Sequence, residues 1–309
     1  MKTVLVLGAL GGVGKAVAKA FVAGGWHVLG LVRPGKEEGL SDGVSAVTAD
    51  LFDAAEVTRA AQKIAGPIDV VFNGLNAPYP KWPTDALPLY TAAADIAESL
   101  GARHIYPGSV YNFGASMPPE LTPATPFAAT TVKGRIRVAI EVMLEDRART
   151  GRLKTIVVRA GDFFGDKAQN SWMNALIAKN LKKGVITAPG RYDTSHAWAF
   201  LPDLAEVIVR LAGIEGRLGT YEVFHFENHN ATLRQLAAAG EKATGRKVRL
   251  THMPRFAFSL IALFDPFMKA ALEMLYLWDV PHALKDDRLA QVLGDLPKTP
   301  LPSALKSLL

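Results

Sequence analysis

Four closely spaced glycines near the N-terminus are the residues of this chain whose pattern indicates a specific chemistry. The apolar run 3–7 leads directly into Gly8, Gly11, Gly12 and Gly14, and an amphipathic helical pattern follows. In such a turn, Gly8 permits a tight bend, Gly11 lets the main chain approach a pyrophosphate, and Gly14 lets the helix pack closely on its strand. The first N–H groups of the helix can then bind the anion. The spacing therefore predicts a dinucleotide-binding turn.

The residues around this turn are needed to tell a ligand site from a plain turn, because glycine-rich turns also occur wherever strands simply meet helices. Val13, Val17 and Phe21 recur at helical spacing, and a second apolar run, 27–32, follows the Gly24-Gly25 pair. Together they form a strand–helix–strand unit of about thirty residues, which is the context that a dinucleotide site requires. This context favours nucleotide binding.

Strand and helix patterns alternate through the first half of the chain. The expected strands are 3–7, 27–33, 44–49, 69–74, 103–108 and 154–160, and the expected helices are 13–23, 54–65, 85–100 and 131–149. Alternation of this kind predicts an α/β fold with a Rossmann-type, doubly wound parallel sheet. Because no strand alternates strictly between apolar and polar residues, we expect both faces of the sheet to be covered.

The pattern loosens after about residue 166 into short strands, loops and helices near 171–183, 203–212 and 232–243. We therefore expect a dinucleotide-binding domain over 1–167 and a smaller, mainly substrate-binding region over 168–309. Residues 194–228 are expected to return to the first domain.

Composition excludes several classes of protein. The chain has 309 residues, no cysteine and a net charge of +6. Disulfides, thiolate nucleophiles and cysteine metal sites are therefore absent. The basic residues are dispersed in short clusters such as Lys179-Lys182-Lys183 and Arg246-Lys247-Arg249, so we expect no nucleic-acid partner.

Two apolar segments have some features of membrane-targeting sequences. The run after Lys2 passes into glycines rather than a cleavage site, so we interpret it as a strand and expect a cytoplasmic protein. In the stretch Arg255–Trp278, Asp265-Pro266 interrupts the apolar residues, so we expect no membrane span. An amphipathic anchor is an alternative for this stretch, but helices packed over a pocket or at a subunit contact are favoured.

Several of these segments together resemble the extended short-chain dehydrogenase/reductase family of NAD(P)-dependent epimerases and dehydratases. GALGGVGKA is similar to the family's G-x-x-G-x-x-G turn, and Ala49-Asp50-Leu51 to the segment after the third strand whose acidic residue faces the adenine ring. HIYPGSVYNFG resembles the fifth strand with the active-site serine, and VVRAGDFFG the sixth-strand segment that passes the nicotinamide. The resemblance covers most of the chain.

The resemblance and the glycine pattern together imply a set of cofactor-binding residues. They are Gly8, Gly11, Gly12, Val13, Gly14, Arg33, Lys36, Asp50, Leu51, Asn73, Gly74, Lys133, Ala160 and Gly161. We expect NADP(H) rather than NAD(H), because Arg33 after the second strand can contact a 2′-phosphate bidentately and Lys36 adds positive charge nearby. The alternative is that Arg33 is an ordinary exposed loop residue.

The resemblance also implies catalytic residues, with one departure. Ser109 aligns with the family serine that polarises the substrate oxygen, and Lys133 with the lysine that holds the nicotinamide ribose. The family places a tyrosine four residues before this lysine, and this chain has Ala129 there. Alanine cannot transfer a proton, so Tyr111, Thr130, water or the substrate itself must replace the phenol.

Two classes of function remain open. The preferred one is an NADP(H)-dependent oxidoreductase or epimerase that exchanges a hydride with a carbonyl or alcohol carbon of a small molecule or sugar nucleotide. The alternative is a catalytically silent NADP(H)-binding sensor or interaction protein. The resemblance suggests a homodimer through 85–100 and 131–149. His225 and His229 are four residues apart, but they lie around a strand end rather than on a predicted helix, so we expect no metal.

Overall fold

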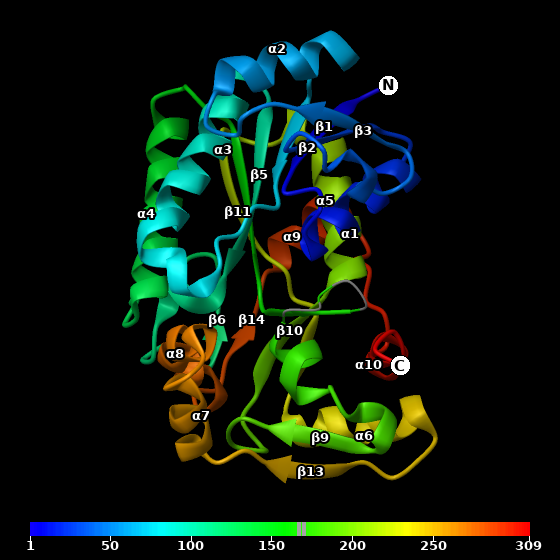
Figure 1. Cartoon of the computed structure of the whole chain (residues 1–309), viewed down its shortest axis with the longest axis vertical. Helices are drawn as coiled ribbons and strands as arrows, with labels where there is room; N and C mark the ends of the chain where they lie inside the picture. Colours follow the sequence, from blue (N-terminus) through cyan, green and yellow to red (C-terminus); the bar gives the residue numbers. More distant parts are fainter. Residues whose placement is uncertain (166–167, 169–170) are drawn as a thin grey trace.

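Seven parallel strands form the main sheet of the computed structural model, which describes residues 1–165, 168 and 171–309 (Figure 1). They are β1 (Thr3–Leu7), β2 (His27–Val32), β3 (Val44–Thr48), β4 (Val70–Asn73), β5 (Arg103–Ser109), β7 (Thr155–Ala160) and β11 (Tyr221–His225). Their order, β11-β7-β5-β4-β1-β2-β3, reverses between β1 and β4. The predicted doubly wound parallel sheet is confirmed, and its switch point lies at the end of β1.

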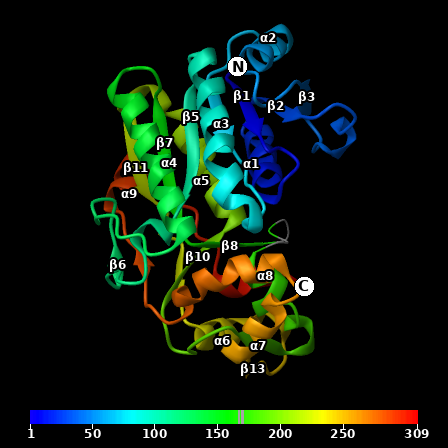
Figure 2. The same ribbon diagram turned by 60° about the vertical axis from the view of Figure 1, so that its left-hand side comes forward.

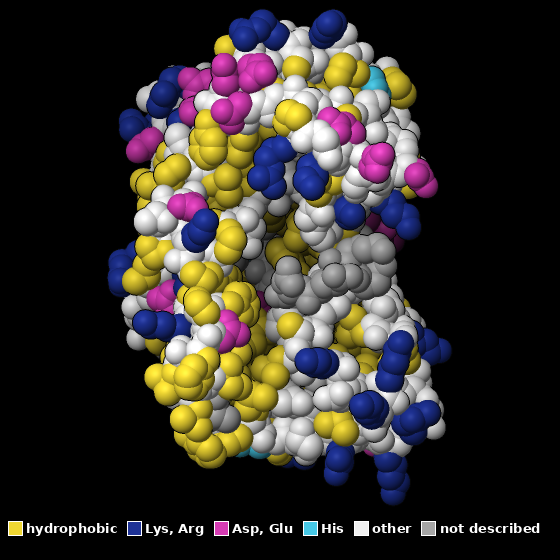
Figure 3. All heavy atoms as spheres, in the orientation of Figure 1, with side chains coloured by type: hydrophobic (Ala, Val, Ile, Leu, Met, Phe, Trp, Pro, Cys, Tyr) yellow, Lys and Arg dark blue, Asp and Glu magenta, His cyan; other side chains and the backbone are white. Residues whose placement is uncertain are grey.

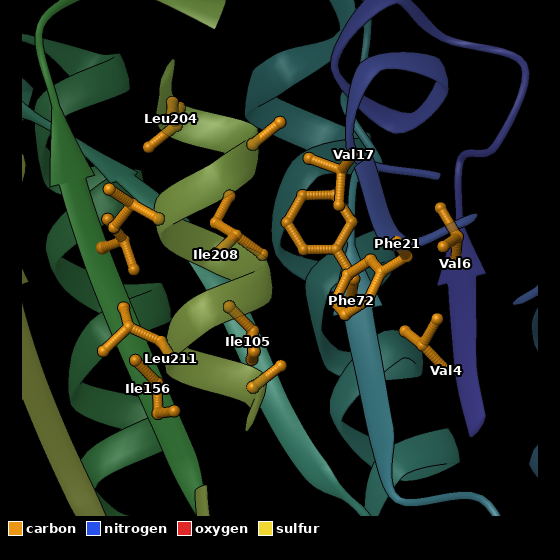
Figure 4. Packing of buried hydrophobic residues seen from close by; sticks show 14 of the residues in the cluster. Val4, Val6, Val17, Phe21, Phe72, Ile105, Ile156, Leu204, Ile208 and Leu211 are labelled. Atoms are coloured by element: carbon orange, nitrogen blue, oxygen red, sulfur yellow. The ribbon is translucent and has the colours of Figure 1, made fainter. Parts of the chain in front are cut away.

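Helices cover both faces of this sheet, as the strand sequences predicted. On one face α1 (Gly12–Ala23) packs beside α5 (Leu201–Gly213), and on the other lie α2 (Ala54–Ala65), α3 (Leu87–Leu100) and α4 (Val132–Arg149). Side chains alternate between the faces along β1, so Val4 packs with Phe21 of α1 and Ile208 of α5 (Figure 4), whereas Leu5 faces the other helices. Burial on both faces explains why the strands read as continuous apolar runs.

A smaller lobe lies below the carboxyl ends of the strands (Figure 2). Its strands are β8 (Asp162–Phe164), β9 (Val185–Ala188), β10 (His196–Phe200), β12 (His229–Ala231) and β13 (Arg249–His252), and β6 (Glu120–Leu121) pairs with β14 (Ala283–Leu284) nearby. Its helices are α6 (Leu233–Thr244), α7 (Arg255–Ala262), α8 (Pro266–Ala271) and α10 (Leu301–Lys306), while α9 (Asp287–Leu293) packs near β11. Trp198, Phe164 and Leu236 are at the centre of the lobe's own core.

The expected boundaries match the structure unevenly. The segment 194–228 supplies α5 and β11 to the larger unit but β10 to the smaller sheet. The expected boundary at 167 lies outside the described residues, so the domain division stays a prediction. The helix expected over 171–183 forms only short turns, because the Ser171 and Asn174 side chains bond to each other and to the backbone instead.

A buried ion pair ties α4 to the main sheet. Glu141 on α4 is fully buried and accepts hydrogen bonds from Arg159 of β7, at 2.7 Å from Nη2 and 3.0 Å from Nε. Asn112 donates to the same carboxylate at 2.9 Å, and the Arg159 Nη1 lies 3.2 Å from His225 Nε2. Burial, with the positive charge of Arg159, lowers the pKa of His225 to about 3, so its ring is neutral. This network fixes the segment after β5 against the sheet.

Removing the buried carboxylate tests this role of Glu141. We expect Glu141→Ala to lower the free energy of unfolding by about 3–5 kcal/mol, because Arg159 is left as an uncompensated buried charge. Glu145→Ala, on an exposed position of the same helix, is the matched control and should change it by less than about 0.5 kcal/mol. Urea denaturation measures both values. Equal losses in the two variants would contradict the assignment.

Candidate functional site

Two glycines of the turn between β1 and α1 are held in direct backbone contact. Gly8 has a φ of +72°, and a Cβ atom on it would lie 2.6 Å from the carbonyl oxygen of Gly74. A Cβ atom on Gly14 would lie 2.1 Å from the carbonyl oxygen of Gly8. Neither position accepts a side chain at such distances. The close packing of α1 against the ends of β1 and β4 therefore requires both glycines.

Gly11, at the start of α1, differs because the space beside it is open. A Cβ atom there would meet only the Gly8 carbonyl oxygen, at 3.3 Å. Helix α1 has no side-chain cap and no acidic residue in its first turn, so the N–H groups of Gly12 and Val13 are uncapped. Asn73 ends the adjacent β4, and its buried Nδ2 has no partner among the described residues. Open space, free N–H groups and an unpaired amide fit the pyrophosphate of a dinucleotide.

The loop after β2 leaves its basic side chains unpaired. Glu37 in this loop accepts hydrogen bonds from the Gly35 N–H at 3.1 Å and from the Thr48 hydroxyl of β3 at 3.2 Å. Backbone N–H groups of Glu37 itself and of Gly35 lower the pKa of its carboxyl group. Arg33 and Lys36 are exposed, and within the described part of the chain neither side chain has a partner. An anionic group at this end of the sheet would therefore meet free cations.

The remaining predicted cofactor residues also lie at the carboxyl edge of the sheet. Asp50 follows β3 and accepts the Phe52 N–H at 3.0 Å, while the half-buried Leu51 packs against the core on the α2 side. Ala160 ends β7, and a Cβ atom on the adjoining Gly161 would lie 2.1 Å from a carbonyl oxygen of β10. The structure brings these residues to one edge, and their contact with a cofactor stays a prediction.

Ser109 lies at the end of β5, in register with Ala160 of β7. Its hydroxyl oxygen accepts the Tyr111 N–H at 3.4 Å, and the side chain is partly exposed. Because the hydroxyl proton is not used in this contact, Ser109 can donate a hydrogen bond to an oxygen at the sheet edge.

Lys133 lies in the first turn of α4 and is almost fully buried. Its ammonium group donates to the Ala270 carbonyl and to the Glu273 carboxylate, both at 2.6 Å, and lies 4.9 Å from the centre of the Tyr79 ring. An ammonium group has three donors, so one is left for another acceptor. The segment that contains α8 thus covers this lysine.

Tyr111 and Tyr79 form a pair, of which the sequence analysis identified only Tyr111. Their hydroxyl oxygens are 2.9 Å apart. Burial raises the pKa of Tyr79 to about 12 and raises that of Tyr111 well above its ordinary value. Both phenols are therefore protonated at neutral pH, and each can donate a hydrogen bond. Tyr79 stacks on Phe267 of α8 with ring centres 5.2 Å apart.

Ala129 and Thr130, shortly before Lys133, lie outside α4 and therefore do not place a proton donor on that helix. Helix α4 begins at Val132 after the cap residue Thr131, so Ala129 and Thr130 precede the helix. The Thr130 hydroxyl accepts the Ala115 N–H at 3.0 Å and holds the loop before the helix. A helical pair of residues 129 and 133 is not formed here.

A carboxylate and a histidine near the tyrosine pair were also missed. Asp162 of β8 accepts a hydrogen bond from His196 Nε2 at 2.8 Å, and its negative charge helps to raise the pKa of Tyr79 and Tyr111. The His196 ring stacks on Trp278 with centres 4.4 Å apart. These partners are distant in sequence, so only Asp162, within the VVRAGDFFG segment, gave a local signal.

Comparisons with known proteins agree with this geometry. A model of the NAD dependent epimerase/dehydratase family matches residues 4–224, and a search of curated proteins found no match. A structure from Burkholderia cenocepacia J2315, provisionally described as an epimerase, superposes with a TM-score of 0.76 at 21% identity, covering 99% of this chain and 96% of that one.

Two complexes are also similar to this chain. UDP-glucose 4-epimerase from Brucella ovis in complex with NAD has a TM-score of 0.74 at 17% identity, and the Bifidobacterium longum enzyme in complex with NAD+ and UDP has 0.73 at 16%. The alignments cover 99% of this chain and 97% of each of those chains. At these sequence identities the similarity shows a shared fold alone.

A substitution at Gly11 tests whether the open side of the turn faces a ligand. We expect Gly11→Ala to leave the free energy of unfolding within about 1 kcal/mol, because the methyl group meets only one backbone oxygen. The affinity for NADPH and NADH, measured by fluorescence titration, should fall at least about tenfold. Gly213→Ala, in open space at the end of α5, is the matched control. Unchanged affinity in Gly11→Ala would exclude a pyrophosphate at this turn.

Proposed function

The chain belongs to the NAD dependent epimerase/dehydratase family, and we propose that it is an NADP(H)-dependent oxidoreductase or epimerase with a tyrosine pair in place of the usual helical tyrosine. One observation carries the proposal. The Tyr111 hydroxyl, two residues after Ser109, lies 2.9 Å from the Tyr79 hydroxyl, and the Lys133 ammonium group lies over the Tyr79 ring, 4.9 Å from its centre. The chain thus keeps serine, lysine and phenol in one place although residue 129 is alanine.

The preference for NADP(H) is supported by the charges after β2. Arg33 and Lys36 are free of side-chain partners within the described residues, whereas Glu37 is engaged with Thr48 and the loop backbone. A guanidinium group binds phosphate oxygens in a bidentate manner, so this loop favours a ribose that has a 2′-phosphate.

The protein residues would manage the oxygen and the proton of the substrate. When bound, the nicotinamide supplies or accepts the hydride. Ser109 donates a hydrogen bond to the substrate oxygen, and Tyr111 donates the proton that this oxygen needs as a carbonyl becomes an alcohol. Tyr79, which is partly exposed, can then return a proton to Tyr111 through their 2.9 Å contact and take a proton from solvent in turn. Because burial raises the pKa of both phenols, both are protonated at neutral pH, which is the form that a proton donor requires.

Lys133 would position the cofactor ribose rather than donate a proton to the substrate. Its remaining N–H group is available to a ribose hydroxyl, and the other two hold the segment 270–273 over the site. The substrate class follows from this chemistry and from the family: a small carbonyl compound or a sugar nucleotide.

One observation favours a second candidate function. Because residue 129 is alanine and precedes α4, the chain has no phenol at the position of the family's proton donor, and a cofactor-binding sensor without turnover would need none. Hydride transfer to any substrate that depends on Ser109 or Lys133 would exclude this reading. Absence of turnover over a panel of aldehydes, ketones and UDP-sugars, with tight cofactor binding, would favour it.

The tyrosine pair can be tested by removing single hydroxyl groups. With a ketone or UDP-sugar that the wild type reduces, Tyr111→Phe should lower kcat about a hundredfold or more, because the acid is lost. Tyr79→Phe should have a smaller effect, since it acts through Tyr111. NADPH affinity should change by less than about twofold in both. Tyr192→Phe, at a half-buried position packed against the core of the smaller lobe, is the control. Wild-type kcat in Tyr111→Phe would refute the relay.

A further inference from the structure

Helices α7 and α8 expose an unusual concentration of large apolar side chains. We call this surface the apolar knob, which comprises Phe256, Leu260, Ile261, Leu263, Phe264 and Phe267. Phe264 is 88% exposed and Leu263 72% exposed. Figure 3 shows hydrophobic side chains gathered at the lower left, over these helices. Surface patches of this kind mark an interaction site.

The packing of α7 gives no folding reason for the knob. Its inner face already packs on the protein through Phe258 and Ala262, which are buried. A helix on the surface of a globular protein normally has a polar outer face. In α7 the outer residues Phe256, Leu260 and Ile261 are apolar as well. The outer face is therefore suited to an apolar environment outside the chain.

A basic strip lies at the same end of the molecule. It comprises the exposed residues Lys179, Lys182, Lys183, Arg246, Lys247 and Arg249, none of which forms an ion pair within the described part of the chain. Arg246 donates to the Lys182 carbonyl at 3.1 Å, and Arg249 pairs with Val185 in the β9–β13 sheet. Strand β13 runs from this strip along the lower edge of the molecule and leads directly into α7 (Figure 1).

Among the described residues, the acidic side chains Asp265 and Glu241 lie next to the knob and the strip, and both accept backbone hydrogen bonds. Asp265, between α7 and α8, accepts hydrogen bonds from the N–H groups of Phe267 and Met268 and caps α8. Glu241 beside the strip accepts the Val248 N–H at 3.0 Å. The two surfaces together therefore present apolar side chains and unpaired positive charge, without a comparable acidic patch.

From this combination we propose that the knob and the basic strip dock the protein onto an anionic lipid bilayer. The knob would enter the boundary between headgroups and acyl chains, and the strip would contact anionic headgroups. No described helix is long and apolar enough to cross a membrane, so the contact is with one leaflet surface. We favour a bilayer over a second copy because the exposed basic side chains of the strip are without ion pairs in the described part of the chain and an anionic surface supplies the matching charge. The proposal does not depend on the enzymatic activity.

Vesicle binding tests the docking surface directly. The full-length protein should sediment with phosphatidylcholine vesicles that contain about 30% phosphatidylserine, and at least about tenfold less with pure phosphatidylcholine. The Leu263→Glu/Phe264→Glu variant should lose binding at least about tenfold, because charge is placed on the inserted face. Lys182→Glu/Lys183→Glu should lose the dependence on phosphatidylserine.

The controls separate docking from misfolding and from self-association. Phe52→Glu changes a residue of similar exposure, 65%, on the larger unit and should bind vesicles like the wild type. The thermal midpoint of the knob variant should be unchanged, since both of its side chains lie mostly in solvent. Absence of vesicle binding by the wild type, or an equal loss in Phe52→Glu, would overturn the proposal. A dimer that the knob variant dissociates, without vesicle binding, would assign the surface to a second copy instead.

Discussion

The backbone contact among Gly8, Gly14 and Gly74 is the constraint on which the rest of the site depends. It brings the start of α1 against the ends of β1 and β4, at the point where the strand order of the sheet reverses. Any side chain at Gly8 or Gly14 would push α1 away from the sheet. This contact places the uncapped N–H groups of α1 at the edge of the sheet. The unpaired Asn73 amide and the residues Ser109 and Ala160 lie at the same edge.

The sequence predicted the parts of this arrangement that depend on local patterns. The β1–Gly8–α1 unit, the parallel sheet and the helix with Lys133 follow from apolar periodicity and glycine spacing, and the structure has them at nearly the expected residues. The partners within the candidate site were harder to predict, because they are distant in sequence. Tyr79 reaches Tyr111 across 32 positions and Asp162 reaches His196 across 34, so no local spacing relates them. Side-chain hydrogen bonds likewise broke the helix expected over 171–183.

Helix α8 connects the two surfaces that have been described. Its inner side covers the candidate site, since the Ala270 carbonyl accepts from Lys133 and Phe267 stacks on Tyr79. Phe267 is also 44% exposed and adjoins the rest of the apolar knob, which lies in α7 and in the turn before α8. The buried Glu141–Arg159 pair holds the opposite side of the site against the sheet. The candidate site thus lies between a rigid sheet edge and a cover whose outer face is apolar.

The central claim is that the glycine turn and the loop after β2 bind NADP(H), and a paired titration with NADPH and NADH tests it most directly. The account predicts tighter binding of NADPH, and Arg33→Asp should weaken NADPH at least about tenfold while changing NADH little, because the lost contact is to the 2′-phosphate. Arg217→Asp makes the same charge change just before β11, at the opposite edge of the sheet, and should leave both affinities unchanged. Equal binding of both cofactors, unaffected by Arg33→Asp, would contradict the NADP(H) preference. No binding of either would contradict the dinucleotide site itself.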